Sequence, residues 1–481
     1  MNVEKVNLSF IEKHNIYFLP IFLLLADYIA ILTAEQFSFI ARDWLLPDRA
    51  GTFHLSWLSF YVFVPLIYIT FLQLGQLYFS RREFWQVVEK LFYTVLYAIL
   101  AIVLLLYVVK IADNTSRLYV GLLWISSFIF LTVFRYGMQH LFMYLGILQL
   151  PVLLIGAGKT GALVAKSFSK DPGLGYKIIG FLEDDVPQDG LAANFPVLGR
   201  FADAEHIIRT TQIKYVVITA PGLSKEALLA LLYRIQPLVK NVSFVPDLLG
   251  MPTGGITLEN LFNEKLVLLQ VKNNLARKYN RIFKFCFDLV LTTVGSICIL
   301  PVLLVIALLI YKDDPGPVIF KHMRIGRNGR LFPCYKFRSM CIDAPERLQK
   351  YLAENPAARR EWQREFKLKD DPRVTKIGAF LRRTSLDELP QIFNVFRGEM
   401  SLVGPRPIIE AEIVKYGQHI QDFYAVRPGI TGFWQVNGRS DTTYDERVEM
   451  DSWYVRNWSV WLDLMILFRT FKAVFSGKGA Y

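Results

Sequence analysis

Two adjacent carboxylates, Asp387 and Glu388, stand near the start of a segment that has helical periodicity. Apolar side chains recur on one side of this segment, at Leu386, Leu389, Ile392, Phe393 and Phe396. The unpaired N–H groups at a helix start stabilise ionised carboxylates and attract phosphate. One carboxylate of such a pair could attack phosphorus while the other holds a divalent metal ion. The basic pair Arg382 and Arg383 precedes the segment and would add positive charge.

A purely structural role fits the same residues. Ser385 followed by Glu388 three residues later matches a capping box, and Asp387 would complement the helix dipole. Pro390 fits poorly if Ser385 is the N-cap, because it then lies beyond the turn whose N–H groups are free. It fits well if Asp387 is the cap. The spacing alone therefore leaves capping and catalysis as equal alternatives.

Basic and aromatic residues alternate between 332 and 340, as on a strand. Lys336 and Arg338 would point to the same face, since side chains on a strand repeat every two residues. Two cations on one face could grip a diphosphate, although a solvated basic face fits the pattern equally well.

Two further stretches carry arginines in stiff or tightly turned backbone. Prolines flank Arg406 and hold it extended, which presents its guanidinium to a phosphate with little loss of entropy. The glycine-rich stretch 427–439 contains Arg427, Trp434 and Arg439. Trp434 could stack on a base, but a tryptophan in the core is the favoured interpretation.

The chain is too apolar for an ordinary soluble protein, with 53% hydrophobic and 14% aromatic residues. Apolar runs at 16–39, 55–79, 91–111 and 118–141 each reach the roughly 20 residues that cross a bilayer as a helix. We therefore predict a four-helix transmembrane domain over residues 1–150. Asp27 and Glu35 lie in the first run and are expected to face other helices or the interface, because charges are costly in lipid.

Residues 151–265 predict a Rossmann-like domain. A buried strand leads into the turn Gly156-Ala-Gly-Lys-Thr-Gly161, an amphipathic helix follows, and acidic residues end the second strand. Gly156, Gly158 and Gly161 could let the backbone approach a pyrophosphate. The same glycines can serve only a close contact between helix and strand. We favour a ligandless or regulatory domain over one that binds NAD.

The third region, 275–481, begins with an apolar run from 282 to 311 that Pro301 interrupts. Basic residues flank the run on both sides, and positive charge favours the cytoplasm. The simplest geometry is a re-entrant membrane helix that breaks at Pro301, where the proline removes a backbone hydrogen bond. The alternative is a fifth spanning helix, which would leave everything after 311 outside the cell. Near the C-terminus, 453–475 is typical of an amphipathic helix that lies on the membrane surface.

The formal net charge of +12 suits anionic lipid heads or phosphorylated substrates. No recognised nucleic-acid motif accompanies it, so nucleic acid is not an expected partner.

Several ordered strings in the third region resemble a known family. They are Lys336-Phe-Arg-Ser-Met340, Arg383-Thr-Ser-Leu-Asp-Glu-Leu-Pro-Gln391, Met400-Ser-Leu-Val-Gly-Pro-Arg-Pro407, Arg427-Pro-Gly-Ile-Thr-Gly432 and Gln435-Val-Asn-Gly-Arg439. This region resembles the monotopic phosphoglycosyl transferases, also called bacterial sugar transferases. The whole layout resembles the large members, which include undecaprenyl-phosphate galactose and glucose phosphotransferases. The segment 454–459 is more similar to the galactose type.

The resemblance implies a two-step reaction. Asp387 would attack the sugar-bearing phosphorus of a UDP-hexose, release UMP and form an aspartyl phosphosugar. Undecaprenyl phosphate would then take the phosphosugar. Glu388 would help to hold Mg²⁺, and the implied substrate contacts are Lys336, Arg338, Arg382, Arg383, Arg406, Arg427, Gln435, Arg439 and Asp451.

The resemblance also implies a setting. The catalytic domain would lie on the cytoplasmic face of a bacterial inner membrane, as a homodimer that starts a surface polysaccharide such as O-antigen or capsule. One departure concerns the helix break: many relatives have Ser-Pro there, whereas this chain has Leu300-Pro301 with Ser296 a turn earlier.

Two other classes of protein share features with this sequence. A membrane-anchored nucleotide-sugar dehydratase or epimerase would need Tyr-x-x-x-Lys, and no tyrosine has this spacing. A non-enzymatic membrane scaffold or sensor would explain residues 1–265, but not the carboxylates, arginines and glycines gathered between 330 and 440.

Overall fold

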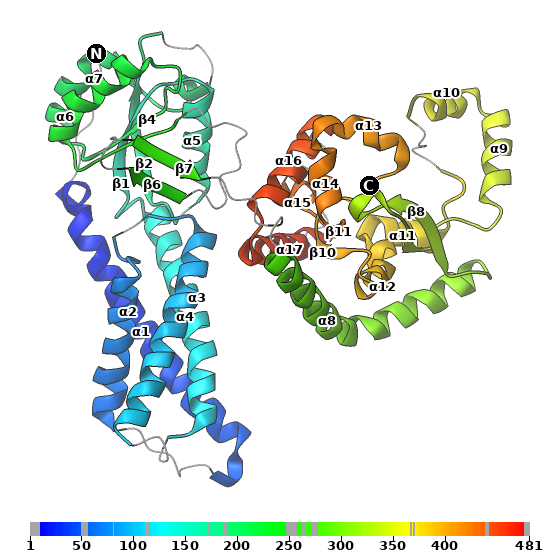
Figure 1. Cartoon of the computed structure of the whole chain (residues 1–481), viewed down its shortest axis with the longest axis horizontal. Helices are drawn as coiled ribbons and strands as arrows, with labels where there is room; N and C mark the ends of the chain where they lie inside the picture. Colours follow the sequence, from blue (N-terminus) through cyan, green and yellow to red (C-terminus); the bar gives the residue numbers. More distant parts are fainter. Residues whose placement is uncertain are drawn as a thin grey trace. The chain divides into compact units, whose positions relative to one another are not determined.

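The computed structural model of the chain describes residues 10–49, 56–79, 81–110, 115–171, 173–185, 190–246, 257–261, 266–270, 275, 278–365, 368, 371–437 and 442–475. The chain forms two compact units, Met1–Leu248 and Leu249–Tyr481, which are described separately below (Figure 1).

Three helices of the first unit are long and apolar enough to cross a membrane. They are α1 (Phe10–Leu45), α3 (Phe84–Val108) and α4 (Arg117–Leu145). Between α1 and α3, after the short η2 (Pro47–Arg49), an apolar helix covers only 59–74, as the π-helical η3 (Ser59–Phe63) and α2 (Val64–Leu74). At 1.5 Å per residue this helix is about 24 Å long, short of the roughly 30 Å hydrocarbon core. The second of the four predicted spans therefore stays a prediction.

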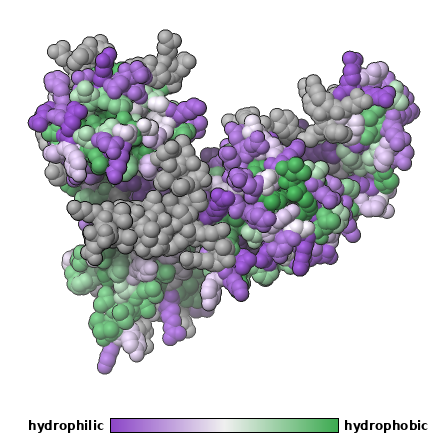
Figure 2. Space-filling model, turned by 45° about the horizontal axis from the view of Figure 1, so that its top comes forward, coloured by the Kyte–Doolittle hydropathy of each residue, from purple (hydrophilic) through white to green (hydrophobic). Residues whose placement is uncertain are grey.

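The long helices expose apolar side chains outward and bury their charges between them. Ile29, Leu100 and Ile129 are each at least half exposed, and Figure 2 shows hydrophobic surface over this part of the chain. Asp27 of α1 forms a buried ion pair with Arg135 of α4, with 2.8 Å between Oδ1 and Nε. Asp27 thus faces another helix, as expected for a charge that lipid would penalise.

The rest of the first unit is a doubly wound parallel sheet, as predicted. Its strand order is β3-β2-β1-β4-β5, with β1 (Leu150–Ile155), β2 (Tyr176–Leu182), β3 (Val197–Gly199), β4 (Tyr215–Ile218) and β5 (Asn241–Phe244). Helix α5 (Lys159–Lys170) packs in one apolar cluster, and α6 (Ala204–Thr211) with α7 (Lys225–Ile235) packs in another. Short 3-10 turns complete it at η5 (Gly190–Ala193), η6 (Phe201–Asp203) and η7 (Gln236–Leu238). This order is that of dinucleotide-binding folds.

In the second unit, an antiparallel hairpin, β6 (Thr257–Leu261) and β7 (Leu266–Gln270), precedes the long helix α8 (Lys278–Asp313). The two parts of α8, Lys278–Ile297 and Ile299–Asp313, are bent by 62° (Figure 1). The bend follows from Pro301, which lacks the N–H that would bond to the carbonyl four residues earlier, at Ile297. The predicted break is thus present as a bend, and re-entry into a membrane remains a prediction.

The hairpin of β8 (Ile319–Ile325) and β9 (Leu331–Phe337) follows α8, with η9 (Arg327–Gly329) at its turn. Helices α9 (Ala344–Glu354), α10 (Pro356–Glu365) and α11 (Lys376–Thr384) lead to η10 (Leu386–Gln391) and α12 (Ile392–Phe396). Two short parallel strands, β10 (Ser401–Val403) and β11 (Gly429–Thr431), pair next to α12. The remaining elements are η11 (Glu410–Glu412), α13 (Ile413–Tyr416), η12 (Gly417–His419), α14 (Ile420–Ala425), α15 (Phe433–Asn437), α16 (Tyr444–Asn457) and α17 (Val460–Phe475).

Candidate active site

Ser385, which has a left-handed backbone conformation, sets the direction of the segment that carries Asp387 and Glu388. Ser385 ends α11 with φ 57° and ψ 18°, and η10 begins at the next residue. This conformation costs a non-glycine residue roughly 1 kcal/mol, so the packing of α11 and η10 must hold it. The predicted continuous helix from 386 to 396 is therefore divided: the carboxylates lie in the first turn of the 3-10 helix η10, and the α-helix begins only at Ile392.

The capping-box interpretation of Ser385 and Glu388 is wrong. The Ser385 side chain makes no capping hydrogen bond. Glu388 instead accepts a hydrogen bond from Nζ of Lys336, on strand β9, at 2.6 Å from Oε1. The carboxylate faces the neighbouring hairpin because the left-handed Ser385 starts a new helix in a new direction. Glu388 therefore belongs to a tertiary charge cluster and not to a helix cap.

Burial and nearby positive charge have opposite effects on the pKa of Asp387. Burial raises the pKa of Asp387 above its ordinary value, and the neighbouring Glu388 raises this pKa too, whereas Lys336 and Arg382 lower it. Among the described residues no basic side chain forms an ion pair with Asp387. A carboxylate of raised basicity without an ion-pair partner is a better nucleophile than one held in a salt bridge.

Lys336 and Arg338 are each engaged with a different acidic residue. Lys336 pairs with Glu388. Arg338, just beyond β9, donates to the carbonyl of Asp314, and its Nη2 is 3.5 Å from the Asp314 carboxylate. A diphosphate held by both cations, as the sequence suggests, would have to compete with these contacts.

The arginines beside the carboxylates differ in exposure. Nε of Arg382 donates to the Ser339 hydroxyl at 2.9 Å, which holds this guanidinium near Asp387. Arg383 and Arg406 are exposed. The charges of Arg406 and Glu388 both act on the pKa of Arg324 in β8, so that these three groups lie near one another. Arg324 was not among the predicted site residues; it is one of the basic residues that follow the apolar run 282–311, and the pairing of β8 with β9 brings it to this cluster.

Asp451, predicted to contact substrate, is buried in α16, with 3% of its surface exposed. It accepts a hydrogen bond from the Tyr416 hydroxyl at 2.9 Å. Burial raises the pKa of Asp451 to about 7, against the lowering effects of Tyr416 and of the backbone N–H and charge of Arg406. Its surroundings suit a residue that positions the Arg406 loop, since a buried carboxylate offers no open surface to a substrate.

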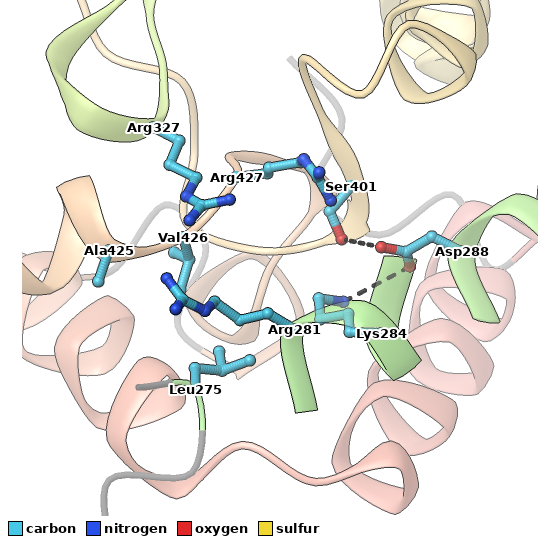
Figure 3. Close-up of a pocket in the computed structure, with 9 residues that line it drawn as sticks. All are labelled: Leu275, Arg281, Lys284, Asp288, Arg327, Ser401, Ala425, Val426 and Arg427. Atoms are coloured by element: carbon cyan, nitrogen blue, oxygen red, sulfur yellow. Dashed lines mark hydrogen bonds and ion pairs between the residues drawn. The ribbon is translucent and has the colours of Figure 1, made fainter. Parts of the chain in front are cut away.

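Three predicted contacts lie in or near the stretch 427–439. Arg427 is not among the charged neighbours of Asp387 and lines a separate pocket (Figure 3). Its guanidinium carbon lies 4.5 Å from the centroid of the Phe285 ring. Gln435 lies in α15, beside Gly432. Trp434 is buried, as expected of a core tryptophan. Arg439 lies outside the described residues.

The carboxylate pair is compatible with Mg²⁺. Within the described part of the chain no group of three or more His, Cys, Asp or Glu side chains could hold a metal. Mg²⁺ commonly binds through one or two carboxylates and completes its shell with water and substrate phosphates. Lys336 uses only Oε1 of Glu388, so Oε2 and the Asp387 carboxylate fit this donor set.

The glycine turn of the first unit is largely filled by its own chain. A Cβ on Gly161 would lie 2.5 Å from the Gly156 carbonyl, and one on Gly156 would lie 2.9 Å from the backbone of Thr219. Glu183 accepts a hydrogen bond from the Ala157 N–H at 2.5 Å, where a dinucleotide fold would offer N–H groups to phosphate. Only Gly158 has open space around it. These contacts favour a structural role for the glycines.

Known proteins similar to this chain show its family. The family described as bacterial sugar transferase matches residues 279–477. The undecaprenyl-phosphate galactose phosphotransferase of Salmonella typhimurium is 36% identical over 405 residues, 84% of each chain. The chain belongs to the bacterial sugar transferases. The UDP-galactose-lipid carrier transferase of Erwinia amylovora is 38% identical over 406 residues, again 84% of each chain. The UDP-glucose:undecaprenyl-phosphate glucose-1-phosphate transferase of Escherichia coli is 34% identical over 338 residues, 69% of this chain and 68% of the relative.

Membership of the bacterial sugar transferases makes the chain an enzyme and removes the non-enzymatic scaffold as an alternative. A second family, described as a CoA-binding domain, matches residues 73–246. That match includes α3 and α4 together with the parallel sheet, so it begins well before residue 151, where the sequence predicted the Rossmann-like domain to start.

Proposed function

We propose that this bacterial sugar transferase moves a hexose 1-phosphate from a UDP-hexose to undecaprenyl phosphate and releases UMP. Galactose is the favoured hexose and glucose the second choice, because relatives that cover 84% of the chain carry galactose in their names and a relative that covers less carries glucose. The reaction would be the first membrane step of surface polysaccharide synthesis.

One observation carries the proposal: no described residue forms a salt bridge with Asp387, while its neighbour Glu388 is held by Lys336 at 2.6 Å. The lysine fixes one carboxylate, and its positive charge also acts on the other. Two adjacent carboxylates thus have different surroundings, which is how active sites separate the roles of paired acidic residues.

In the first step an Oδ atom of Asp387 attacks the sugar-bearing phosphorus. A bond from this oxygen to phosphorus forms, the bond from phosphorus to the bridging oxygen breaks, and UMP leaves with the electron pair. In the second step a phosphate oxygen of undecaprenyl phosphate attacks the same phosphorus. The aspartyl oxygen then leaves, which regenerates the Asp387 carboxylate and yields the diphosphate-linked sugar.

The side chains around Asp387 would bind and orient the phosphates. Lys336 and Arg382 lie close enough to act on the pKa of Asp387, and exposed Arg406 lies in the charge cluster of Glu388 and Arg324. Glu388 and Asp387 would hold Mg²⁺, which would neutralise negative charge on the phosphates when bound. Such positioning and charge neutralisation is the main contribution of proteins to phosphoryl transfer.

The membrane setting fits a lipid acceptor. Three long apolar helices in the first unit and the bent, apolar α8 in the second are suited to a bilayer. With α8 re-entrant, both of its ends would be cytoplasmic, and a soluble nucleotide sugar and a lipid phosphate could meet at one surface.

The test is UMP release by the purified full chain with Mg²⁺, undecaprenyl phosphate and either UDP-galactose or UDP-glucose. We expect UMP to depend on the lipid, with the higher rate for UDP-galactose. Without the lipid, a single burst of UMP equal to the amount of enzyme is expected, because the aspartyl intermediate would accumulate. Release of UDP in place of UMP would contradict the proposal, since it would mean transfer of the sugar alone.

A further inference from the structure

A second basic pocket lies on the first part of α8. Its cavity volume is about 30 Å³, and its polar lining is Arg281, Lys284, Asp288, Arg327, Ser401 and Arg427. Figure 3 shows the side chains of Arg281, Arg327 and Arg427 around one space, with Asp288 and Ser401 to one side. These residues come from α8, from the turn of the β8–β9 hairpin, from the start of β10 and from the loop before β11.

The single carboxylate that lines the pocket is already occupied. Asp288 accepts a hydrogen bond from the Ser401 hydroxyl at 2.7 Å and lies 3.5 Å from the Lys284 ammonium. Lys284 in turn pairs with the buried Asp463 at 2.8 Å. This buried network holds one lysine between two carboxylates. The three arginines therefore still exceed the remaining negative charge among the described residues of the pocket and this network.

The three guanidinium groups are half-buried and repel one another. Burial lowers the pKa of Arg327, and the charge of Arg281 lowers it further. Burial and the charge of Arg327 likewise lower the pKa of Arg427, whereas the charge of Asp288 raises it. Nε of Arg327 is buried without a hydrogen-bond partner in the part of the chain that the structure describes. A buried donor without a partner is unfavourable, and an anion that accepted its hydrogen bond would relieve this.

Helix α8, which lines one side of the pocket, also exposes apolar side chains on its other faces. Ile282, Phe283 and Val290 are 62%, 56% and 61% exposed, and the turn of the helix points Phe283 and Val290 away from Arg281. Helix α17, whose Asp463 is bonded to Lys284, exposes Phe468 and Phe471. Arginines beside an exposed apolar helix surface are suited to the depth of lipid head groups, where basic pockets bind phospholipid phosphates.

We propose that Arg281, Arg327 and Arg427 bind the head-group phosphate of an anionic phospholipid, with the acyl chains lying along the exposed apolar face of α8. This site is distinct from the active site, because Asp387, Glu388, Lys336 and Arg382 do not line it. A bound phospholipid would join α8, the β8–β9 turn and the loop before β11, and so fix the catalytic unit on its helix. The inference does not depend on the proposed reaction.

The test is native mass spectrometry of the purified full chain in detergent, titrated with cardiolipin or phosphatidylglycerol. The test variant is R281Q/R327Q, which leaves Arg427 in place. Since each charge-assisted hydrogen bond contributes about 1.5 kcal/mol or more, we expect the double variant to bind cardiolipin roughly tenfold or more weakly. R281K/R327K, which keeps both charges, should recover part of the binding. R359Q removes the same charge from an exposed position on α10 and should bind like the wild type.

Separate titrations distinguish the source of the phosphate. Neutral phosphatidylcholine, undecaprenyl phosphate and inorganic phosphate are each added in place of the anionic phospholipid. Cardiolipin or phosphatidylglycerol binding that is weakened in R281Q/R327Q and partly restored in R281K/R327K supports the proposal. Equal binding by R281Q/R327Q and R359Q would overturn it, as would loss of binding only for undecaprenyl phosphate or only for inorganic phosphate. Circular dichroism of the variants separates loss of the site from loss of the fold.

Discussion

Two groups of acidic side chains in the second unit differ in how their oxygens are used. Asp288 and Asp463 are almost fully buried, and their oxygens are taken by Lys284, Ser401, Tyr454 and Trp458. Asp387 and Glu388 are only partly buried, and within the part of the chain that the structure describes they form one ion pair, between Glu388 and Lys336. The carboxylates of Asp288 and Asp463 thus hold elements of the fold together, whereas those of Asp387 and Glu388 are available for chemistry.

The difference teaches which carboxylates can react. The oxygens of Asp288 and Asp463 accept hydrogen bonds from neighbouring side chains, so neither carboxylate can approach a phosphorus atom without breaking those bonds. Burial raises the pKa of Asp288 too, so a raised pKa alone does not mark a reactive carboxylate. A half-buried carboxylate with its pKa raised by burial keeps a free oxygen of greater basicity. Substitution should therefore remove activity at one group and stability at the other.

The largest expected effect is that of Asp387→Asn. Loss of the attacking oxygen should lower UMP release at least about 10³-fold, as is typical when a nucleophile is removed. The melting temperature should not fall, because the raised pKa shows that the ionised carboxylate is unfavourable in the folded state. Assays of UMP and thermal unfolding on the same preparation check both expectations. Asp343→Asn, at an exposed site, is the matched control.

The opposite pattern is expected of Asp463→Asn. This change leaves the buried Lys284 ammonium without its 2.8 Å partner. Removing one member of a buried ion pair costs about 3–5 kcal/mol. The unfolding transition of the catalytic unit should move to clearly lower temperature, while any folded enzyme keeps its nucleophile. A melting temperature equal to that of the wild type would mean that the two carboxylate groups do not differ as described.

A smaller effect is expected of Glu388→Gln. The neutral amide loses the ion pair with Lys336 and is a poorer ligand for a hard cation. Activity should fall by roughly 10- to 100-fold, and more Mg²⁺ should be needed to reach half of the remaining rate. Titration of Mg²⁺ at saturating UDP-hexose measures this. An unchanged Mg²⁺ requirement would show that Glu388 does not hold the metal.

The smallest effect concerns pH and Lys336→Met. The Lys336 charge lowers the pKa of Asp387. Without this charge the pKa rises, so a higher pH is needed to ionise the nucleophile. The acidic limb of the profile of kcat/KM against pH should therefore move to higher pH in the variant. A limb that stays in place, or moves to lower pH, would mean that Lys336 does not act on the nucleophile.

The sequence predicted the elements well where the pattern is local. The glycine turn and the period of the strands predicted the parallel sheet, and Pro301 predicted the bend of α8, because each depends on backbone chemistry within a few residues. The capping box at Ser385 failed because tertiary packing, which a local pattern does not contain, holds this residue in a left-handed conformation.

The site was predicted less completely, because its contacts join residues that are far apart in the chain. Asp387, Glu388 and Lys336 could be singled out by type and spacing, but spacing did not show that Arg427 lies in another pocket with Arg281 and Arg327. The ion pair of Lys284 with Asp463 joins residues 179 positions apart, and nothing in either local sequence indicates it. Only the folded chain brings such partners together.

The central claim is tested most directly by mass spectrometry of the enzyme after incubation with UDP-galactose and Mg²⁺ in the absence of undecaprenyl phosphate. A hexose phosphate attached to the peptide that contains Asp387, and removed when undecaprenyl phosphate is added, is the predicted result. An adduct on a different residue, or turnover to UMP without any adduct, would contradict the account.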